Sequence, residues 1–131
     1  MTPENYLALG EAFVAAIQSG EAEEVRRFYA PDAKLWHNTD GVEQTVEQNL
    51  KALAWFKRNL PDRNYRVLRR EALADGFMQQ HVLEATLPDG TRWSLDACVV
   101  VRVKDGLITR LDEYIDGVRT AELANVRRQA D

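Results

Sequence analysis

The second half of the chain carries the pattern that most restricts its fold, a series of extended runs separated by tight turns. Three Asp-Gly pairs stand at nearly regular intervals: Asp75-Gly76, Asp89-Gly90 and Asp105-Gly106. Because glycine adopts positive φ angles without steric cost, Asp-Gly between extended runs is a strong hairpin signal. Apolar and polar residues alternate between the turns, which predicts four sequential antiparallel strands. These strands cover residues 65–74, 77–87, 92–103 and 107–116.

The first part of the chain shows helical spacing instead. The predicted helices cover residues 3–20, 21–29, 45–60 and, after the meander, 118–128, with a short strand at 33–38. Thr45 followed three residues later by Gln48 forms a capping-box pattern at the start of the third helix. Helices followed by an antiparallel meander predict an α+β fold, in which the helices pack on one face of a curved sheet.

Composition limits the classes of function. The 131 residues suit a single domain, 1–131, and 45% hydrophobic with 29% charged residues is typical of globular proteins. A net charge of −4 without a basic block argues against nucleic acid and against a membrane surface as partners. The single cysteine, Cys98, excludes an internal disulfide, and no cysteine/histidine cluster indicates a metal site. Because no signal peptide or membrane-spanning run is present, we expect a cytoplasmic protein.

The last predicted strand carries a carboxylate on its apolar face. Successive side chains point to opposite sides of a strand, so Glu113 shares a face with Leu111 and Ile115. A carboxylic acid in apolar surroundings has a raised pKa and can act as a general acid or base near neutral pH. Alternatively, Glu113 lies at a pocket mouth or pairs with an arginine such as Arg69 or Arg92 as a structural polar group.

A second ionisable candidate lies in the short strand "AKLWHN". There, His37 shares a face with Ala33 and Leu35. An imidazole, with an ordinary pKa near 6.5, can relay a proton to or from a carboxylate in a pocket. The alternative is a histidine at a strand end that only hydrogen-bonds to the backbone.

The order of elements resembles the nuclear transport factor 2-like fold, most clearly in "AIQSGEAEEVRRFYAPDAKLWHN" and "KDGLITRLDEYID". Within that superfamily the chain is similar to SnoaL-like polyketide cyclases, ketosteroid isomerases and limonene epoxide hydrolases, over nearly its whole length. The resemblance implies a cone-shaped antiparallel sheet wrapped around the N-terminal helices, with an apolar pocket at one end. It also implies a homodimer joined through sheet faces.

The family pattern, placed on the chain without gaps, implies which positions are functional. The acid that the cyclases and epoxide hydrolases use on the last strand falls on Glu113. The general base of the isomerases falls on His37. Their two oxyanion donors fall on Val99 and Phe13, which cannot donate, so ketosteroid isomerase activity is not expected.

The strand at 77–87 supports two orientations. By periodicity, the face with Gln79 and His81 is the more apolar one. The family placement instead turns Gln80 and Val82 inward, at the positions of the arginine–aspartate pair of the epoxide hydrolases, so that activity is not expected either. Following the family placement, we expect Gln80 in the pocket and His81 on the outer face.

These observations predict a cofactor-independent acid/base enzyme of the cyclase, isomerase, dehydratase or hydrolase type, which acts on a small apolar or polyketide-like molecule. Glu113 moves the proton, His37 assists and Gln80 contacts a substrate oxygen. The other predicted substrate-binding residues form apolar walls: Leu35, Val82, Leu95, Ala97, Val99, Leu111 and Ile115. No metal or organic cofactor is expected. The alternative is a non-catalytic small-ligand-binding or dimeric assembly domain of the same fold.

Overall fold

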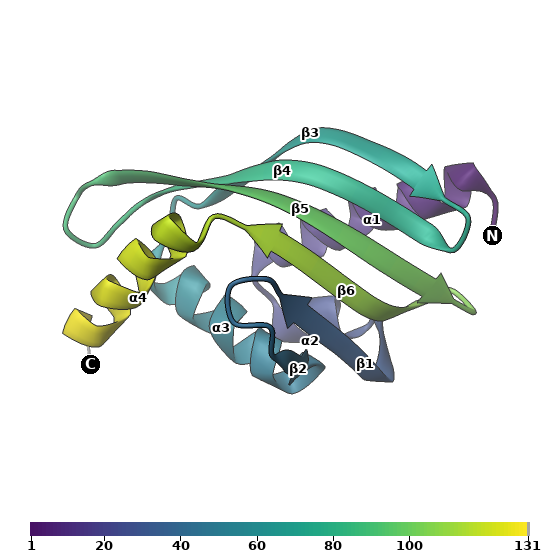
Figure 1. Cartoon of the computed structure of the whole chain (residues 1–131), viewed down its shortest axis with the longest axis horizontal. Coiled ribbons are helices and arrows are strands. Elements are labelled where there is room, and N and C mark those ends of the chain that lie inside the picture. The colour runs from purple at the N-terminus through teal and green to yellow at the C-terminus, as the bar shows by residue number, and fades with distance from the viewer. Residues whose placement is uncertain (131) are drawn as a thin grey trace.

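Helices precede a strand meander, as Figure 1 shows for this computed structural model. The structure describes the backbone of residues 1–130 and the side chains of residues 1–126. The elements in chain order are α1 (Pro3–Ser19), α2 (Ala22–Arg26), β1 (Tyr29–His37), β2 (Glu43–Thr45), α3 (Val46–Asn59), β3 (Asn64–Leu73), β4 (Gly76–Thr86), β5 (Arg92–Lys104), β6 (Leu107–Ile115) and α4 (Gly117–Ala130).

The strands of the described chain form one curved, unclosed sheet in the order β2-β1-β6-β5-β4-β3, with α1, α2 and α3 on one side of it (Figure 1). This arrangement confirms the α+β class and the packing of the N-terminal helices against a curved sheet. Strands β3 to β6 form the predicted antiparallel meander. The sheet is mixed rather than wholly antiparallel, however, because β1 pairs with β6 in parallel.

Local sequence signals set most of the element boundaries. The Thr2 side chain accepts a hydrogen bond from the backbone of Asn5 at the start of α1. The predicted capping box of Thr45 and Gln48 is present at the start of α3. In the β5–β6 turn, Asp105 and Gly106 both have positive φ angles, of 53° and 79°. Two consecutive positive φ angles are the geometry that favours Asp-Gly in two-residue hairpins.

Strand β1 differs from its prediction. It starts at Tyr29, in a segment assigned above to the second helix, and α2 ends at Arg26. The pairing of β1 with β6 shifts between Tyr29 and Lys34, the interval that contains Pro31. Because proline has no N–H to donate, a strand accommodates it at such an irregularity. This longer strand brings the Tyr29 ring into the core.

Strand β4 corrects the expected orientation of Gln80 and Val82. Gln79 pairs with Val99 of β5, and His81 pairs with Ala97. Residues opposite each other in neighbouring strands share a face, so Gln79 and His81 point inward, where both are buried. Gln80 and Val82 therefore point to the outer face. The family placement was offset by one residue, which reverses every side chain of a strand.

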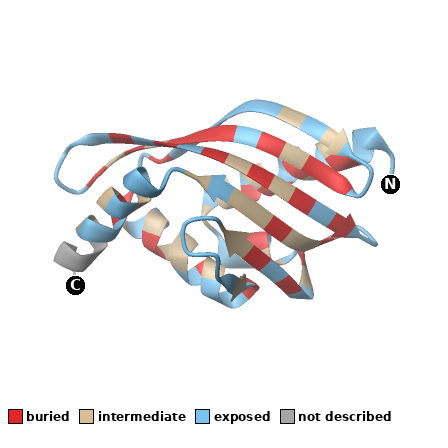
Figure 2. Ribbon diagram, viewed as in Figure 1, coloured by how far each residue is buried: buried red, intermediate tan, exposed pale blue. Residues whose placement is uncertain are grey.

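Burial alternates along β5, as Figure 2 shows, and less regularly along β4, where Val82 of the outer face is also buried. Behind the inner face the core divides into two clusters. One surrounds Phe13 of α1 and Leu35 of β1. The other surrounds Trp55 of α3 and Trp93 of β5 and includes Leu123 of α4. No described helix is long and apolar enough to cross a membrane.

Candidate active site

A cavity of about 270 Å³ lies between the inner face of the sheet and helices α1, α3 and α4. Its lining draws on both core clusters: Phe13 and Leu35 come from one, and Leu83 and Leu123 from the other. The cavity thus lies where the core is divided. Most of the predicted site residues line it: Leu35, His37, Leu95, Ala97, Val99, Leu111, Glu113 and Ile115. The lining does not include Gln80 or Val82.

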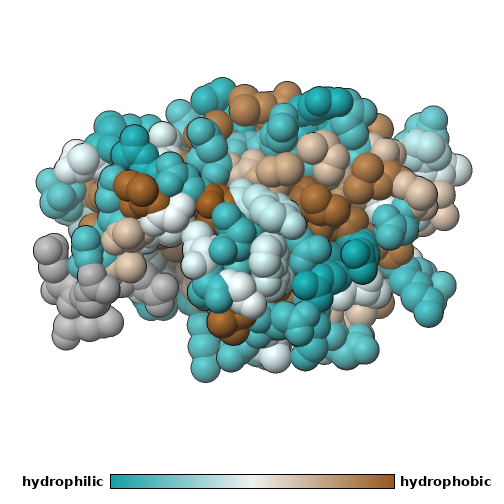
Figure 3. Space-filling view, in the orientation of Figure 1, coloured by the Kyte–Doolittle hydropathy of each residue, from teal (hydrophilic) through white to brown (hydrophobic). Residues whose placement is uncertain are grey.

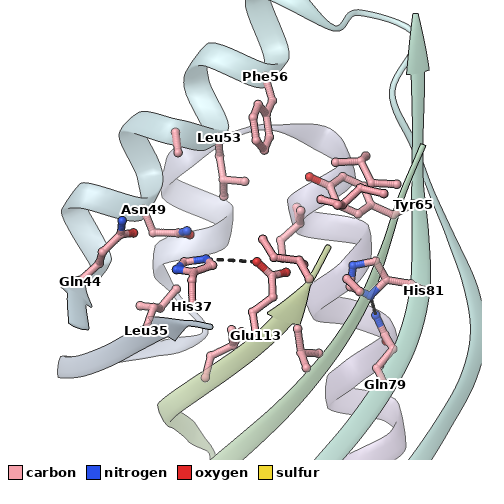
Figure 4. A pocket seen from close by; sticks show the side chains of 18 of the residues that line it. Leu35, His37, Gln44, Asn49, Leu53, Phe56, Tyr65, Gln79, His81 and Glu113 are labelled. Atoms are coloured by element: carbon pink, nitrogen blue, oxygen red, sulfur yellow. Dashed lines mark hydrogen bonds and ion pairs between the residues drawn. The ribbon is translucent and has the colours of Figure 1, made fainter. Parts of the chain in front are cut away.

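Glu113 and His37 meet inside this cavity (Figure 4). They are directly opposite each other in the parallel pairing of β1 with β6. His37 Nε2 lies 3.1 Å from Glu113 Oε1. Both side chains keep some exposure, 17% for His37 and 23% for Glu113, so the pair faces the cavity rather than being sealed in the core.

Asn38 holds the two strands in this register. Its backbone N–H donates to the carbonyl of Glu113, at 3.1 Å. Its side-chain amide then bonds both backbone groups of Ile115: Nδ2 donates to the carbonyl, and Oδ1 accepts from the N–H. The asparagine amide thereby continues the strand ladder one step beyond His37. The hydrogen bonds of Asn38 to Glu113 and Ile115 therefore keep His37 opposite Glu113.

The contact with Glu113 changes the acid–base behaviour of His37. The hydrogen bond that His37 donates to the Glu113 carboxylate raises the pKa of His37, burial opposes this, and the negative charges of Glu113 and Asp40 add to the increase. Gln44 of β2 and Asn49 of α3 also line this side of the cavity (Figure 4). The imidazole is thus biased toward its protonated form beside a carboxylate.

A second polar group occupies the opposite wall. His81 and Gln79 of β4 both line the cavity, although sequence reasoning had placed His81 on the outer face. Gln79 Nε2 lies 3.0 Å from His81 Nδ1, and Arg70 Nε of β3 donates to Gln79 Oε1 at 2.9 Å. Both histidines of the chain therefore line one cavity, on either side of Glu113 (Figure 4).

Two tyrosines, Tyr29 and Tyr65, also line the cavity and were not predicted. Burial raises the pKa of each phenol, and the negative charge of Glu113 raises it further. Both hydroxyls therefore stay protonated and able to donate. The Tyr65 ring packs edge-on against His81, with the ring centres 5.8 Å apart. The alternation of β4 signalled His81, whereas no local pattern signalled Tyr29, which the sequence had assigned to a helix.

The sequence profile of the SnoaL-like domain matches residues 11–111, which cover all the strands except the end of β6. The chain belongs to the SnoaL-like family. In this SnoaL-like protein, the inward positions of β4 next to those expected from the epoxide hydrolase pattern are Gln79, His81 and Leu83. None of them is an arginine or an aspartate, so the expectation against that mechanism is unchanged.

Solved structures resemble the SnoaL-like chain over most of its length. PrhC from Penicillium brasilianum NBRC 6234 gives a TM-score of 0.86 at 16% identity, covering 99% of this chain and 92% of that chain. AclR, a candidate hydroxylase from Streptomyces galilaeus, gives a TM-score of 0.82 at 19% identity, covering 95% of this chain and 86% of that chain. IdmH, a candidate polyketide cyclase from Streptomyces antibioticus, gives a TM-score of 0.78 at 21% identity, covering 91% of this chain and 98% of that chain. At these identities the likeness shows a common fold. No curated protein sequence matches the chain.

The ionisable groups of the cavity do not form an evident metal site. Within the described residues, no group of three or more His, Cys, Asp or Glu side chains is arranged to hold a metal ion. What the arrangement offers directly is one carboxylate between two imidazoles. Around these groups the walls are apolar, formed by residues such as Leu95, Val99 and Leu111.

Proposed function

We propose that this SnoaL-like protein is an acid/base enzyme that transfers a proton on a small, largely apolar molecule bound in the cavity. Glu113 is the group that takes or gives the proton, and His37 is its partner. The proposal needs no metal or organic cofactor. It includes the cyclase, isomerase, dehydratase and hydrolase types of reaction, each of which includes a proton transfer that such a pair can perform.

The contact between His37 and Glu113 inside an apolar cavity carries this proposal. His37 engages only Oε1 of the carboxylate. The other oxygen, Oε2, points away from His37 within the cavity that Glu113 lines (Figure 4). A ligand can therefore exchange a proton with Oε2 while His37 compensates the change in charge through Oε1. A shared hydrogen bond of this kind is a common way to couple two titrating groups.

The cavity supports a small and mostly apolar ligand. Its volume of about 270 Å³ lies near the lower end for small-molecule sites, which starts at roughly 300 Å³. Aliphatic and aromatic side chains, among them Phe56, Leu95 and Ile115, make up most of its wall. A fused two-ring molecule with one or two polar atoms fits this size and polarity.

The proposal can be tested without knowing the natural substrate. The probe is 2-tetralone, a fused two-ring ketone whose CH2 group beside the carbonyl is acidic. NMR in D2O measures both its binding, from line broadening, and the exchange of that CH2 for deuterium. We expect the wild type to accelerate the exchange and Glu113→Gln to slow it at least about 100-fold, the usual contribution of a positioned acid or base.

Asp112→Asn is the matched control, because Asp112 precedes Glu113 in β6 and bonds Arg110 away from the cavity. This variant should exchange the ketone like the wild type. A ketone that binds but exchanges equally fast in wild type and Glu113→Gln contradicts the role of Glu113. A ketone that binds without accelerated exchange in the wild type favours the non-catalytic ligand-binding domain.

A further inference from the structure

A chain of hydrogen-bonded polar side chains runs from the partly buried Arg70 of β3 to two buried residues of the cavity wall, Gln79 and His81. Arg70 of β3 donates through Nε to Gln79 Oε1 at 2.9 Å, and Gln79 Nε2 lies 3.0 Å from His81 Nδ1. Gln79 and His81 are only 2% and 8% exposed. The third buried polar residue of the described chain, Arg63, differs, because its guanidinium donates only to backbone carbonyls and closes a loop.

The direction of this chain determines where His81 carries its proton. The guanidinium of Arg70 can only donate, so the side-chain atom of Gln79 that faces it must be the oxygen. The Gln79 NH2 group is then the atom that faces His81 and donates to Nδ1. A nitrogen that accepts a hydrogen bond is unprotonated, so neutral His81 carries its proton on Nε2.

The second ring nitrogen of His81 is available to a ligand. Among the residues with described side chains, no partner meets Nε2, and no buried side-chain nitrogen or oxygen there lacks a partner. Together these observations mean that Nε2 is not enclosed by protein. In Figure 4 this nitrogen points across the cavity toward Glu113, while the other is bound by Gln79. An N–H donor is therefore directed at the space beside the proposed base.

The surroundings of His81 keep it neutral. Burial lowers the pKa of His81, and the positive charge of Arg70 lowers it further, while the negative charge of Glu113 raises it. Tyr65, which packs on the ring, is an uncharged phenol. The amide of Gln79 opposes protonation as well, because Nδ1 cannot take up a proton without losing this hydrogen bond.

We propose that His81 is a neutral hydrogen-bond donor for an oxygen of the ligand, with Arg70 and Gln79 as the positioning residues that fix its tautomer. The corresponding ligand class is an apolar molecule with a carbonyl group. Binding requires the carbonyl oxygen at His81 Nε2 and the adjoining carbon near Glu113. The reactive role of His81 rests on the function proposed above, whereas its tautomer does not.

This placement has a direct chemical consequence. Glu113 removes a proton from the carbon next to the carbonyl and becomes a carboxylic acid. The electrons of the broken C–H bond form a C=C bond, and the C=O bond becomes C–O⁻. His81 Nε2–H then donates to this enolate oxygen, which is a stronger acceptor than the carbonyl. A donor placed where negative charge develops stabilises the transition state. His81 thereby supplies the hydrogen bond to the oxyanion that Phe13 and Val99, at the donor positions of the isomerases, cannot supply.

The tautomer is measured directly by 15N NMR of the histidine side chains. The chain has two histidines, so His37→Gln leaves His81 as the only signal. We expect one protonated and one bare nitrogen at neutral pH, with the proton on Nε2. A proton on Nδ1, or an imidazolium with both nitrogens protonated, overturns the proposal whatever the outcome of the exchange experiment.

The positioning role is tested by Gln79→Glu, which keeps the shape of the side chain but replaces the donating amide by an acceptor. The carboxylate can pair with Arg70 and accept from Nδ1–H, so we expect His81 to become protonated at Nδ1 and its pKa to rise. Gln80→Glu is the matched control, because Gln80 is the next residue and is exposed on the outer face. Equal His81 spectra in both variants overturn the role of Gln79.

Ligand contact is tested with a pair of probes, 2-tetralone and tetralin, which differ in the carbonyl group. We expect the wild type to bind the ketone about 3- to 10-fold more tightly, the contribution of one neutral hydrogen bond. His81→Phe, confirmed as folded by circular dichroism, should lose this preference and still bind tetralin. An unchanged preference in His81→Phe overturns the proposal. Failure of both probes to bind the wild type contradicts the function proposed above. The 15N measurement still tests the proposed tautomer of His81 in that case.

Discussion

At the level of single residues, the cavity holds two histidines whose surroundings push their pKa values in opposite directions. The hydrogen bond that His37 donates to Glu113 raises the pKa of His37, whereas burial lowers the pKa of His81. Titratable groups separated in this way often divide the acid and donor roles of a site. Glu113 lies between them, so one carboxylate can exchange a proton with a ligand while one imidazole compensates its charge and the other holds an oxygen.

The raised pKa of His37 predicts a pH-dependent contribution to stability. A group whose pKa is higher in the folded state stabilises the fold fully below its unfolded pKa, near 6.5, and loses this effect as the pH rises through its folded pKa. The free energy of unfolding of the wild type should therefore exceed that of Glu113→Gln by about 1 kcal/mol near pH 6, and by less near pH 9. Urea unfolding at both pH values measures this.

Asp112→Asn serves as the control for this titration, because Asp112 precedes Glu113 in β6 and its carboxylate accepts from Arg110, not from His37. Its difference from the wild type should not change with pH. A Glu113→Gln difference that stays constant or grows as the pH rises would contradict the proposed interaction of Glu113 with protonated His37.

At the level of elements, periodicity and turn residues predicted the meander, and the capping signals predicted the ends of α1 and α3. The orientation of β4 was also present in its alternation, since Gln79 and His81 lie on the more apolar face. The ungapped placement of the family pattern nevertheless predicted the wrong orientation, because an offset of one residue turns every side chain of a strand to the opposite face. The parallel pairing of β1 with β6 joins segments about 75 residues apart, which no local pattern reveals.

The candidate site was predictable only in part for the same reason. Glu113 stands out as the one carboxylate in an apolar alternation. The tautomer of His81, in contrast, depends on Arg70, which a neighbouring strand supplies and which no local sequence pattern connects with His81.

Helix α1 offers a test of this chain of contacts from outside the cavity. Gly10 lies in α1, and a Cβ atom there would come within 2.7 Å of Cδ and 2.8 Å of Nε of Arg70. Alanine in a helix normally adds roughly 0.5–1 kcal/mol of stability over glycine. Here we expect Gly10→Ala to displace the Arg70 side chain, weaken its bond to Gln79 and shift the 15N signals of His81.

Ala12→Gly provides the opposite control, because Ala12 also lies in α1 but does not line the cavity. It should lower helix stability and leave the His81 signals unchanged. If Gly10→Ala stabilises the protein and leaves His81 unaffected, Arg70 does not position the histidine through Gln79.

At the level of the whole molecule, the outer face of the sheet carries exposed apolar side chains. Leu68 and Tyr114 are 58% and 49% exposed there, and they flank a groove that also includes Gln80 and Cys98. Figure 3 shows hydrophobic side chains gathered on the face that bears the sheet, interspersed with polar ones. Charges of both signs, such as Arg69 and Asp96, allow two copies to pair across a two-fold axis.

We therefore propose a homodimer joined through this face. Light scattering should give a mass twice the 14.9 kDa of one chain, and Leu68→Glu should halve it. Val118→Glu is the control, because Val118 is 70% exposed on α4, outside the groove. A monomeric wild type, or a Leu68→Glu variant that remains dimeric, contradicts this assembly.

The central claim is that a small ketone binds in the cavity, between His81 and Glu113. The position of a bound molecule tests this claim most directly. The measurement is a crystal structure of the wild type with 2-tetralone. We predict the ketone inside the cavity, its carbonyl oxygen within hydrogen-bond distance of His81 Nε2 and the adjoining carbon next to Glu113 Oε2. A ketone bound elsewhere, or a cavity closed by rearranged side chains so that no molecule reaches Glu113, would contradict the account.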